Sequence, residues 1–156
     1  MEERKKGEGK ALPFKVKRGY TAMPNAVSDY YTMHPRFTGA TERLYLFLLR
    51  MYNDKKGYAY PSYKAIREYT KIGSDGTVNK AIESLEYLRL IRVEKARSAN
   101  GFDNNRYYFV HPIEDFDEFI RSFGDDLPSK YRDIEADLDE GDSASDDDFE
   151  GLTTWL

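Results

Sequence analysis

The segment 74–89 carries side chains with the chemistry to read base edges in duplex DNA. Within two helical turns of one another stand Thr77, Asn79, Lys80 and Glu83. Asn can form two hydrogen bonds with adenine, Lys can donate to guanine or to a phosphate, and Glu can accept from the amino group of cytosine. Such readout requires a helix that buries one face in its own domain and presents the other face to a groove.

The apolar residues of this segment predict the buried face. They recur at intervals of three and four residues and form one stripe: Val78, Ala81, Ile82, Leu85 and Leu88. This spacing is typical of an amphipathic helix, and Ser74 or Asp75 provides its N-cap. At 100° per residue the opposite face holds Gly76, Lys80, Glu83 and Tyr87, flanked by Asn79 and Ser84.

Phosphate contacts are expected from neighbouring elements, because such contacts position a protein on DNA and supply much of its affinity. The first turn of the preceding helix offers Ser62, Tyr63 and Lys64, beside free N–H groups that favour an anion. A hairpin that follows the reading helix offers Lys95, Arg97, Asn100, Asn104 and Arg106. An N-terminal stretch, expected to reach the flanking duplex or its minor groove, offers Lys15, Lys17 and Arg18.

The elements that position these residues are predicted in the order helix, extended piece, helix, turn, helix, strand, hairpin and strand. Residues 44–52 are apolar almost all the way round and indicate a central, buried helix. A second helix is expected after Ser62. Two β-prone stretches, 90–94 and 107–110, flank an Asn-Gly pair that is typical of a hairpin tip.

Three short motifs in this order resemble the winged helix-turn-helix of phage and plasmid replication proteins and related regulators. They are Tyr60-Pro61-Ser62 before the second helix, Ser74-x-x-Thr77-Val78 at the start of the third, and Leu85-x-x-Leu88-x-Leu90-Ile91 at its exit. The resemblance covers roughly residues 38–111 and implies three helices with a β-hairpin wing. It also implies sequence-specific binding of double-stranded DNA, in replication initiation or maintenance or in transcriptional regulation.

The chain departs from that pattern at two places. Arg89 stands where the family usually has Gly, so a differently shaped exit from the third helix is expected. Asp75 and Gly76 stand in the first turn of the reading helix, where basic residues are common. We therefore expect less phosphate clamping at that turn.

Charge divides the chain into two parts of opposite sign. Residues 1–112 hold 21 Lys and Arg against 12 Asp and Glu, whereas residues 113–156 hold 3 against 16. The basic part suits a phosphate backbone, and the acidic part repels it. We predict an α+β chain in four segments: a flexible basic arm over 1–13, a winged-helix domain over 14–112, a short acidic amphipathic helix over 113–124 and an acidic, largely disordered tail over 125–156.

Several function classes lack the residues that they need. The chain has no Cys, which excludes disulfides, Cys-ligated zinc and a thiol nucleophile, and its two His lie far apart. The sequence contains no glycine loop for a nucleotide and no apolar run of the roughly 18 residues that a membrane-spanning helix needs. We expect a cytoplasmic protein with no enzymatic activity, cofactor, metal or membrane partner.

The tail, the oligomeric state and the function leave alternatives open. Trp155 and Leu156 could dock a replication or transcription protein, or the acidic tail could fold back on the basic domain or only aid solubility. A homodimer could form through the N-terminal segment or through the 113–123 helix. Besides duplex binding, the residues allow an adaptor that has lost DNA binding, or a single-strand binder that uses the aromatic run 107–109.

Overall fold

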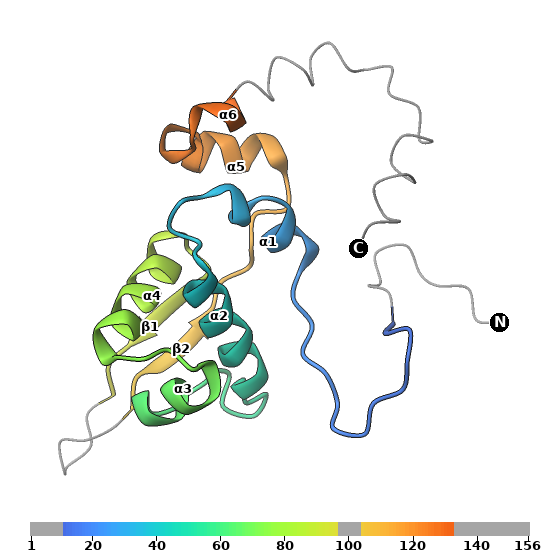
Figure 1. Cartoon of the computed structure of the whole chain (residues 1–156), viewed down its shortest axis with the longest axis vertical. Helices are drawn as coiled ribbons and strands as arrows, with labels where there is room; N and C mark the ends of the chain where they lie inside the picture. The colour runs from blue at the N-terminus through green and yellow to red at the C-terminus, as the bar shows by residue number, and fades with distance from the viewer. Residues whose placement is uncertain (1–10, 97–103, 133–156) are drawn as a thin grey trace.

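The computed structural model describes residues 11–96 and 104–132, and Figure 1 shows the path of the chain. Two short helical segments come first, three helices and a hairpin follow, and three further helical segments end the described part. In chain order the elements are α1 (Asn25–Asp29), η1 (Tyr31–Met33), α2 (Gly39–Met51), α3 (Tyr63–Thr70), α4 (Asp75–Tyr87), β1 (Ile91–Glu94), β2 (Arg106–Phe109), α5 (Phe116–Phe123), η2 (Gly124–Asp126) and α6 (Ser129–Arg132).

Hydroxyl residues begin the three central helices. The side-chain oxygens of Thr38, Ser62 and Ser74 accept hydrogen bonds from backbone N–H groups in the first turns of α2, α3 and α4. The donor–acceptor distances are 3.3, 3.1 and 3.2 Å in the same order. Each such cap satisfies an otherwise free N–H group and stabilises its helix by about 1 kcal/mol. The caps therefore fix the positions of the polar side chains in each first turn.

One hydrophobic core joins the three helices to the hairpin. The stripe of α4 predicted from the sequence is buried at every position: Val78, Ala81, Ile82, Leu85 and Leu88. Helix α2 packs against it and contributes Leu44 and Leu48, which are fully buried. The hairpin closes the core with Ile91 and Tyr107. Burial of one such side chain contributes roughly 1.5–3 kcal/mol, so this packing dominates the placement of α4.

A third short segment extends the two-stranded hairpin. Strands β1 and β2 pair antiparallel, with Arg92 opposite Tyr108. The backbone of Ala59 bridges to Tyr107 through two hydrogen bonds of 3.0 and 2.8 Å. Because side chains alternate between the faces of a strand, one face of this small sheet packs on the helices and the other points away from them.

Helix α4 is followed by a residue in the left-handed conformation, Arg89, whose φ is 55°. The N–H of Leu90 donates to the carbonyl of Leu85, and the N–H of Arg89 donates to that of Glu86, both at 3.0 Å. These are the two bonds of a Schellman motif. The expectation of a differently shaped exit is therefore wrong, because the hydrogen bonds hold the turn that a glycine would adopt more easily.

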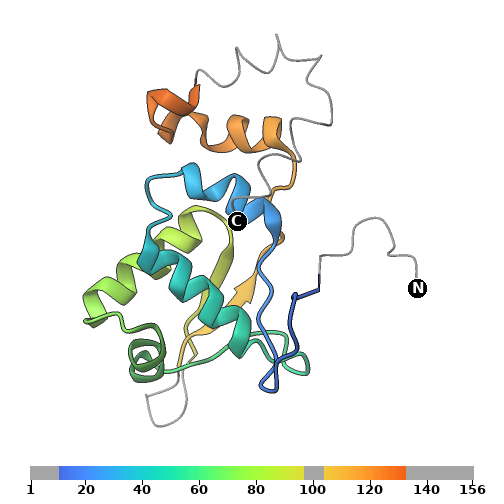
Figure 2. The same cartoon turned by 45° about the vertical axis from the view of Figure 1, so that its right-hand side comes forward.

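Residues 113–132 pack against the domain. Phe119 of α5 is fully buried, with its ring edge-on to Tyr31 at 5.0 Å between centroids, and Leu127 is only 1% exposed. In Figures 1 and 2 this group of short helices lies over α1. Residues 125–132, the first part of the segment predicted as a tail, continue the fold with η2 and α6. The apolar side of α5, proposed as a dimer surface, is occupied within the chain.

Asp126 ties this C-terminal group to α4. Its carboxylate accepts hydrogen bonds from the Tyr87 hydroxyl and from Nε2 of buried His34, the latter at 3.0 Å. Nδ1 of His34 accepts the backbone N–H of Arg36 at 3.0 Å, which leaves the ring proton of the neutral imidazole on Nε2. The Tyr87 bond, followed by the His34 bond, lowers the pKa of Asp126 below its ordinary value.

Replacing Asp126 by Asn should therefore destabilise the protein in a pH-dependent way. The lowered pKa means that the ionised carboxylate stabilises the fold above the unfolded-state value of 3.8, and that this stabilisation is lost as the pH falls through the folded-state value. We expect Asp126→Asn to lower the melting temperature at pH 7. The difference in melting temperature between the variant and the wild type should narrow only below about pH 4. Glu114→Gln is the control, because Glu114 is an exposed acid of the same segment. A difference in melting temperature between Asp126→Asn and wild type that stays constant from pH 7 to pH 2 would contradict the stabilising role of the ionised Asp126.

The left-handed residue at the end of α3 gives a second stability prediction. Lys71 has φ of 62°, which costs an L-residue roughly 1 kcal/mol, and glycine avoids that cost while adding entropy to the unfolded chain. We expect Lys71→Gly to raise the free energy of unfolding by about 0.5–1 kcal/mol, measured by chemical denaturation. Lys71→Ala removes the same charge but keeps Cβ, so an equal gain in both variants would count against the backbone explanation.

Candidate nucleic-acid interface

The exposed face of α4 holds the predicted base-reading residues. Thr77, Asn79, Lys80 and Glu83 are all exposed, and Gly76 precedes them on the same helix. Ser84, expected to flank this face, is instead 9% exposed, because it lies on the side of α4 that packs into the domain. The structure therefore brings the four predicted side chains together on the amino-terminal part of one helix.

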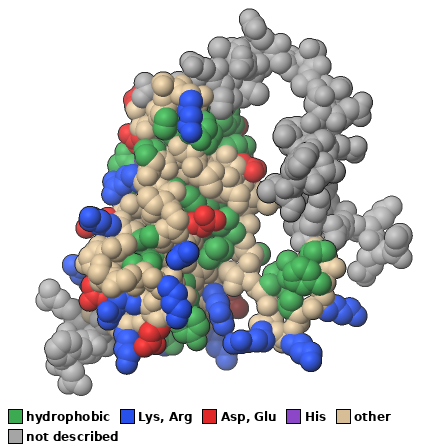
Figure 3. Space-filling view, viewed as in Figure 1, with side chains coloured by type: hydrophobic (Ala, Val, Ile, Leu, Met, Phe, Trp, Pro, Cys, Tyr) green, Lys and Arg blue, Asp and Glu red, His purple; other side chains and the backbone are tan. Residues whose placement is uncertain are grey.

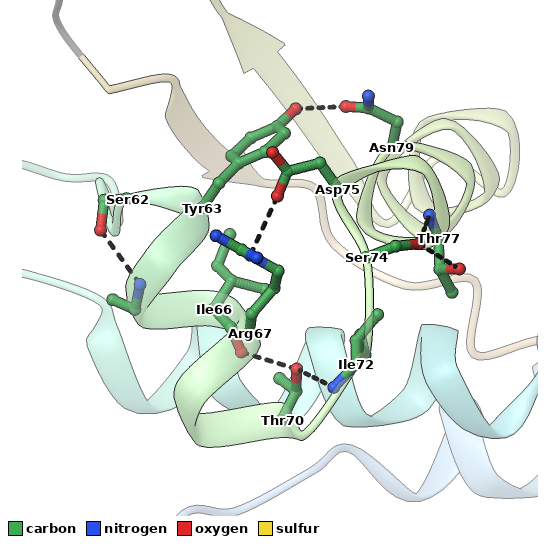
Figure 4. A network of polar contacts seen from close by, with 11 residues as sticks. Ser62, Tyr63, Ile66, Arg67, Thr70, Ile72, Ser74, Asp75, Thr77 and Asn79 are labelled. Atoms are coloured by element: carbon green, nitrogen blue, oxygen red, sulfur yellow. Dashed lines mark hydrogen bonds and ion pairs between the residues drawn. The ribbon is translucent and has the colours of Figure 1, made fainter.

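Tyr63 joins the start of α3 to this face (Figure 4). Its hydroxyl donates a hydrogen bond to Oδ1 of Asn79. Partial burial, followed by the nearby Asp75 carboxylate, raises the pKa of Tyr63, so the phenol stays protonated and remains a donor. The Asn79 oxygen keeps a second lone pair, and its amide nitrogen keeps two hydrogens. The bond thus orients the Asn79 amide and leaves it able to contact a base.

Cap interactions hold the two hydroxyl residues of the predicted site. The N–H of Thr77 donates to Oγ of Ser74, and the two hydroxyl oxygens lie 3.0 Å apart. Oγ of Ser62 accepts the N–H of Ala65 in the same manner, so its own hydrogen remains a donor. Lys64 follows in the first turn of α3 and is exposed. The start of α3, which Tyr63 connects to Asn79, therefore presents a hydroxyl and a cation.

The acidic residue in the first turn of α4 has a partner. Asp75 forms an ion pair with Arg67 at 3.0 Å, across the turn between α3 and α4 (Figure 4). A carboxylate at this position also interacts favourably with the positive end of the helix dipole. Both side chains are exposed, so the pair contributes little to stability. The pair nevertheless directs the Asp75 charge toward α3.

The far end of α4 is closed by the C-terminal group. Tyr87, which the sequence places on the reading face, is 43% exposed, and its hydroxyl is bound to Asp126. The Arg36 guanidinium lies 4.5 Å from the centroid of its ring. The reading face therefore ends before Tyr87. No sequence pattern indicated the Asp126 contact, since 39 residues separate the partners.

The predicted wing residues divide between two places. Lys95 follows β1 and is exposed, whereas Arg97 and Asn100 lie outside the described residues. Asn104 donates through Nδ2 to the carbonyl of Tyr60 at 3.0 Å, and the Arg106 guanidinium lies 5.0 Å from the Tyr58 ring centroid. Asn104 and Arg106 thus belong to the outer face of the small sheet.

The predicted N-terminal contacts lie apart from α4. Lys15, Lys17 and Arg18 are exposed in a segment without helix or strand. In Figures 1 and 2 this segment lies on the other side of α2 from α4, and Arg18 lines a shallow cavity with Arg50 of α2. The structure does not bring these three cations to the reading helix. Trp155 and Leu156, proposed as a docking end, lie outside the described residues.

Basic side chains are common around α3 on the face of the molecule seen in Figure 3. Helix α3 and its end contribute three exposed basic residues, namely Lys64, Arg67 and Lys71. Within residues 11–96 and 104–132, no ion pair involves Lys64 or Lys80. These two cations therefore remain available to an anionic ligand.

Among the residues that the structure describes, no helix is long and apolar enough to cross a bilayer. The same residues contain no group of three or more His, Cys, Asp or Glu side chains that could hold a metal ion.

The segment that contains the three central helices is similar to a known protein family. Residues 38–91 match the model of a helix-turn-helix domain family. The match begins at the N-cap of α2 and ends at the first residue of β1, so it contains α2, α3 and α4. No curated protein and no solved structure gives a significant match to the chain. With the hairpin that follows, residues 38–91 therefore resemble a helix-turn-helix domain, in an α+β arrangement consistent with a winged helix.

Proposed function

We propose that this protein binds double-stranded DNA in a sequence-specific manner, with the amino-terminal half of α4 in the major groove. The observation that carries the proposal is the division of α4 into a fully buried apolar stripe and an exposed face with Asn79, Lys80 and Glu83. A groove-reading helix requires this division. The Tyr63 bond further supports it, because a held amide loses less conformational entropy when it contacts a base.

Cations and a helix start flank the proposed reading face. Ser62 and Lys64 at the start of α3 lie on one side, where free N–H groups also favour a phosphate. Lys95 at the end of β1 offers a further cation from the wing. Phosphate contacts from two elements would hold α4 in register along the groove.

The proposed process is replication initiation or maintenance of a phage or plasmid. It rests on the resemblance of the motifs around Tyr60-Pro61-Ser62 and Leu85–Ile91 to those replication proteins. A transcriptional regulator would use the same DNA contacts and differ in where its sites lie. An adaptor without DNA binding would leave Asn79 and Lys80 without a role.

Selection of bound duplexes from a random library and from genomic fragments tests this proposal with the full chain. A specific binder should enrich one motif, and its affinity should fall with salt by a slope of about −0.9 for each phosphate contacted. We expect Asn79→Ala to cost about 1–3 kcal/mol on the selected site and to relax the preference at one base pair, measured by fluorescence anisotropy. Lys130→Ala, an exposed lysine in α6 at the other end of the molecule (Figure 1), is the control.

The outcomes of this experiment separate the alternatives. Enriched origin fragments would support the replication role, and enriched promoters would favour the regulator. No enrichment and no duplex binding at low salt would overturn the proposal and favour the adaptor. Unchanged affinity and preference in Asn79→Ala would mean that the reading surface lies elsewhere.

A double-mutant cycle tests how Tyr63 contributes. If its hydroxyl acts by orienting Asn79, Tyr63→Phe should weaken binding in the wild type and have no further effect in the Asn79→Ala background. The salt slope should then stay constant. Additive losses, again at a constant slope because a neutral hydroxyl releases no counterion, would instead indicate that the hydroxyl contacts the DNA directly. Binding of the selected duplex over a salt series measures both quantities.

A further inference from the structure

Three tyrosine rings occupy the outer face of the small sheet, where the core does not need them. Tyr58 and Tyr60 flank Ala59, whose bridge to Tyr107 places both rings on the side of Tyr108, away from the helices. The centroid of the Tyr58 ring lies 5.3 Å from that of Tyr108 and 5.9 Å from that of Tyr60. The face of a sheet that points to solvent is commonly polar. Packing of the core therefore does not account for these three rings.

Each of these rings is paired with a cation. Measured from the cation to the ring centroid, the pairs are Lys56 over Tyr60 at 4.3 Å, Arg106 over Tyr58 at 5.0 Å and Arg92 over Tyr108 at 4.2 Å. Glu94 lies 3.7 Å from both arginines, and all three side chains of that group are at least 40% exposed. The face therefore keeps a net positive charge, with its cations held beside aromatic rings.

A cavity of about 340 Å³ opens on this face. It is lined by Lys56, Tyr58, Tyr60, Ala96, Asn104 and Arg106. The Asn104 amide is fixed by its bond to the Tyr60 carbonyl. Two tyrosine rings, two cations and an amide thus line one cavity, which combines aromatic surface, positive charge and hydrogen-bonding groups.

We propose that this tyrosine face, defined by Tyr58, Tyr60 and Tyr108 with Lys56, Arg92 and Arg106, binds single-stranded DNA. Unpaired bases stack on aromatic side chains, and neighbouring cations meet the phosphates, so a sheet face with both is suited to a single strand. A duplex keeps its bases stacked on one another and offers no free base to these rings. The choice of DNA over RNA rests on the proposed function, whereas the single-strand assignment rests on the face itself.

Binding of a labelled oligothymidylate by the full chain at low salt, followed by fluorescence anisotropy, tests this inference. Loss of one stacking ring should lower affinity at least about fivefold, and we expect that loss for Tyr60→Ala. Lys56→Glu should also weaken binding, and it alters an exposed side chain outside the β1–β2 ladder. Tyr69→Ala is the matched control, because Tyr69 is 59% exposed and lies beside Phe47 and Arg50, away from the sheet.

Duplex binding, measured in parallel, keeps this inference separable from the proposed function. Tyr60→Ala should retain duplex affinity, and Asn79→Ala should retain oligothymidylate affinity. No binding of oligothymidylate, equal affinity in the Tyr60, Lys56 and Tyr69 variants, or single-strand binding that depends on Asn79 would each overturn the assignment. Tighter binding of an oligouridylate of equal length, with the same dependence on Tyr60, would overturn the choice of DNA.

Discussion

The orientation of α4 about its own axis is the constraint on which the reading surface depends. Val78, Ile82 and Leu85 are buried against α2 and the hairpin, and each contributes roughly 1.5–3 kcal/mol. Exposed polar side chains exert no comparable force on the helix. Since each residue turns the helix by 100°, burial of the stripe alone determines that Asn79 and Lys80 point away from the domain. The core therefore sets which side chains could meet a ligand.

A second geometric rule, the alternation of side chains along a strand, divides the tyrosines of the hairpin. Tyr107 points inward and is fully buried, which raises its pKa to about 12, whereas Tyr108 points outward beside Arg92. The bridge at Ala59 extends the same rule to Tyr58 and Tyr60. One face of the hairpin thus packs in the core, and the opposite face is exposed and carries aromatic and basic side chains.

Local patterns in the sequence predicted the parts of the fold that neighbouring residues decide. The stripe and N-cap of α4, the N-cap Ser62 and the hairpin all follow from spacing and turn chemistry. Contacts between distant segments carry no such signal. The bonds of Asp126 to Tyr87 and His34 span 39 and 92 residues, and the grouping of Tyr58 with Tyr108 depends on a strand bridge. For the same reason, no pattern in the sequence indicated that residues 125–132 pack against the domain.

The acidic residues that follow the hairpin have local structural roles as well as a collective charge. Asp115 caps α5 by accepting the N–H of Glu118, and Asp117 and Glu118 lie at the positive end of that helix. Asp126 accepts from the carboxyl-terminal end of α4. These acids belong to the group of short helices at the end of the molecule opposite α3 (Figure 1). Their docking uses the last turn of α4 as an anchor, so the face of α4 that stays open to a ligand runs from Thr77 to Glu83.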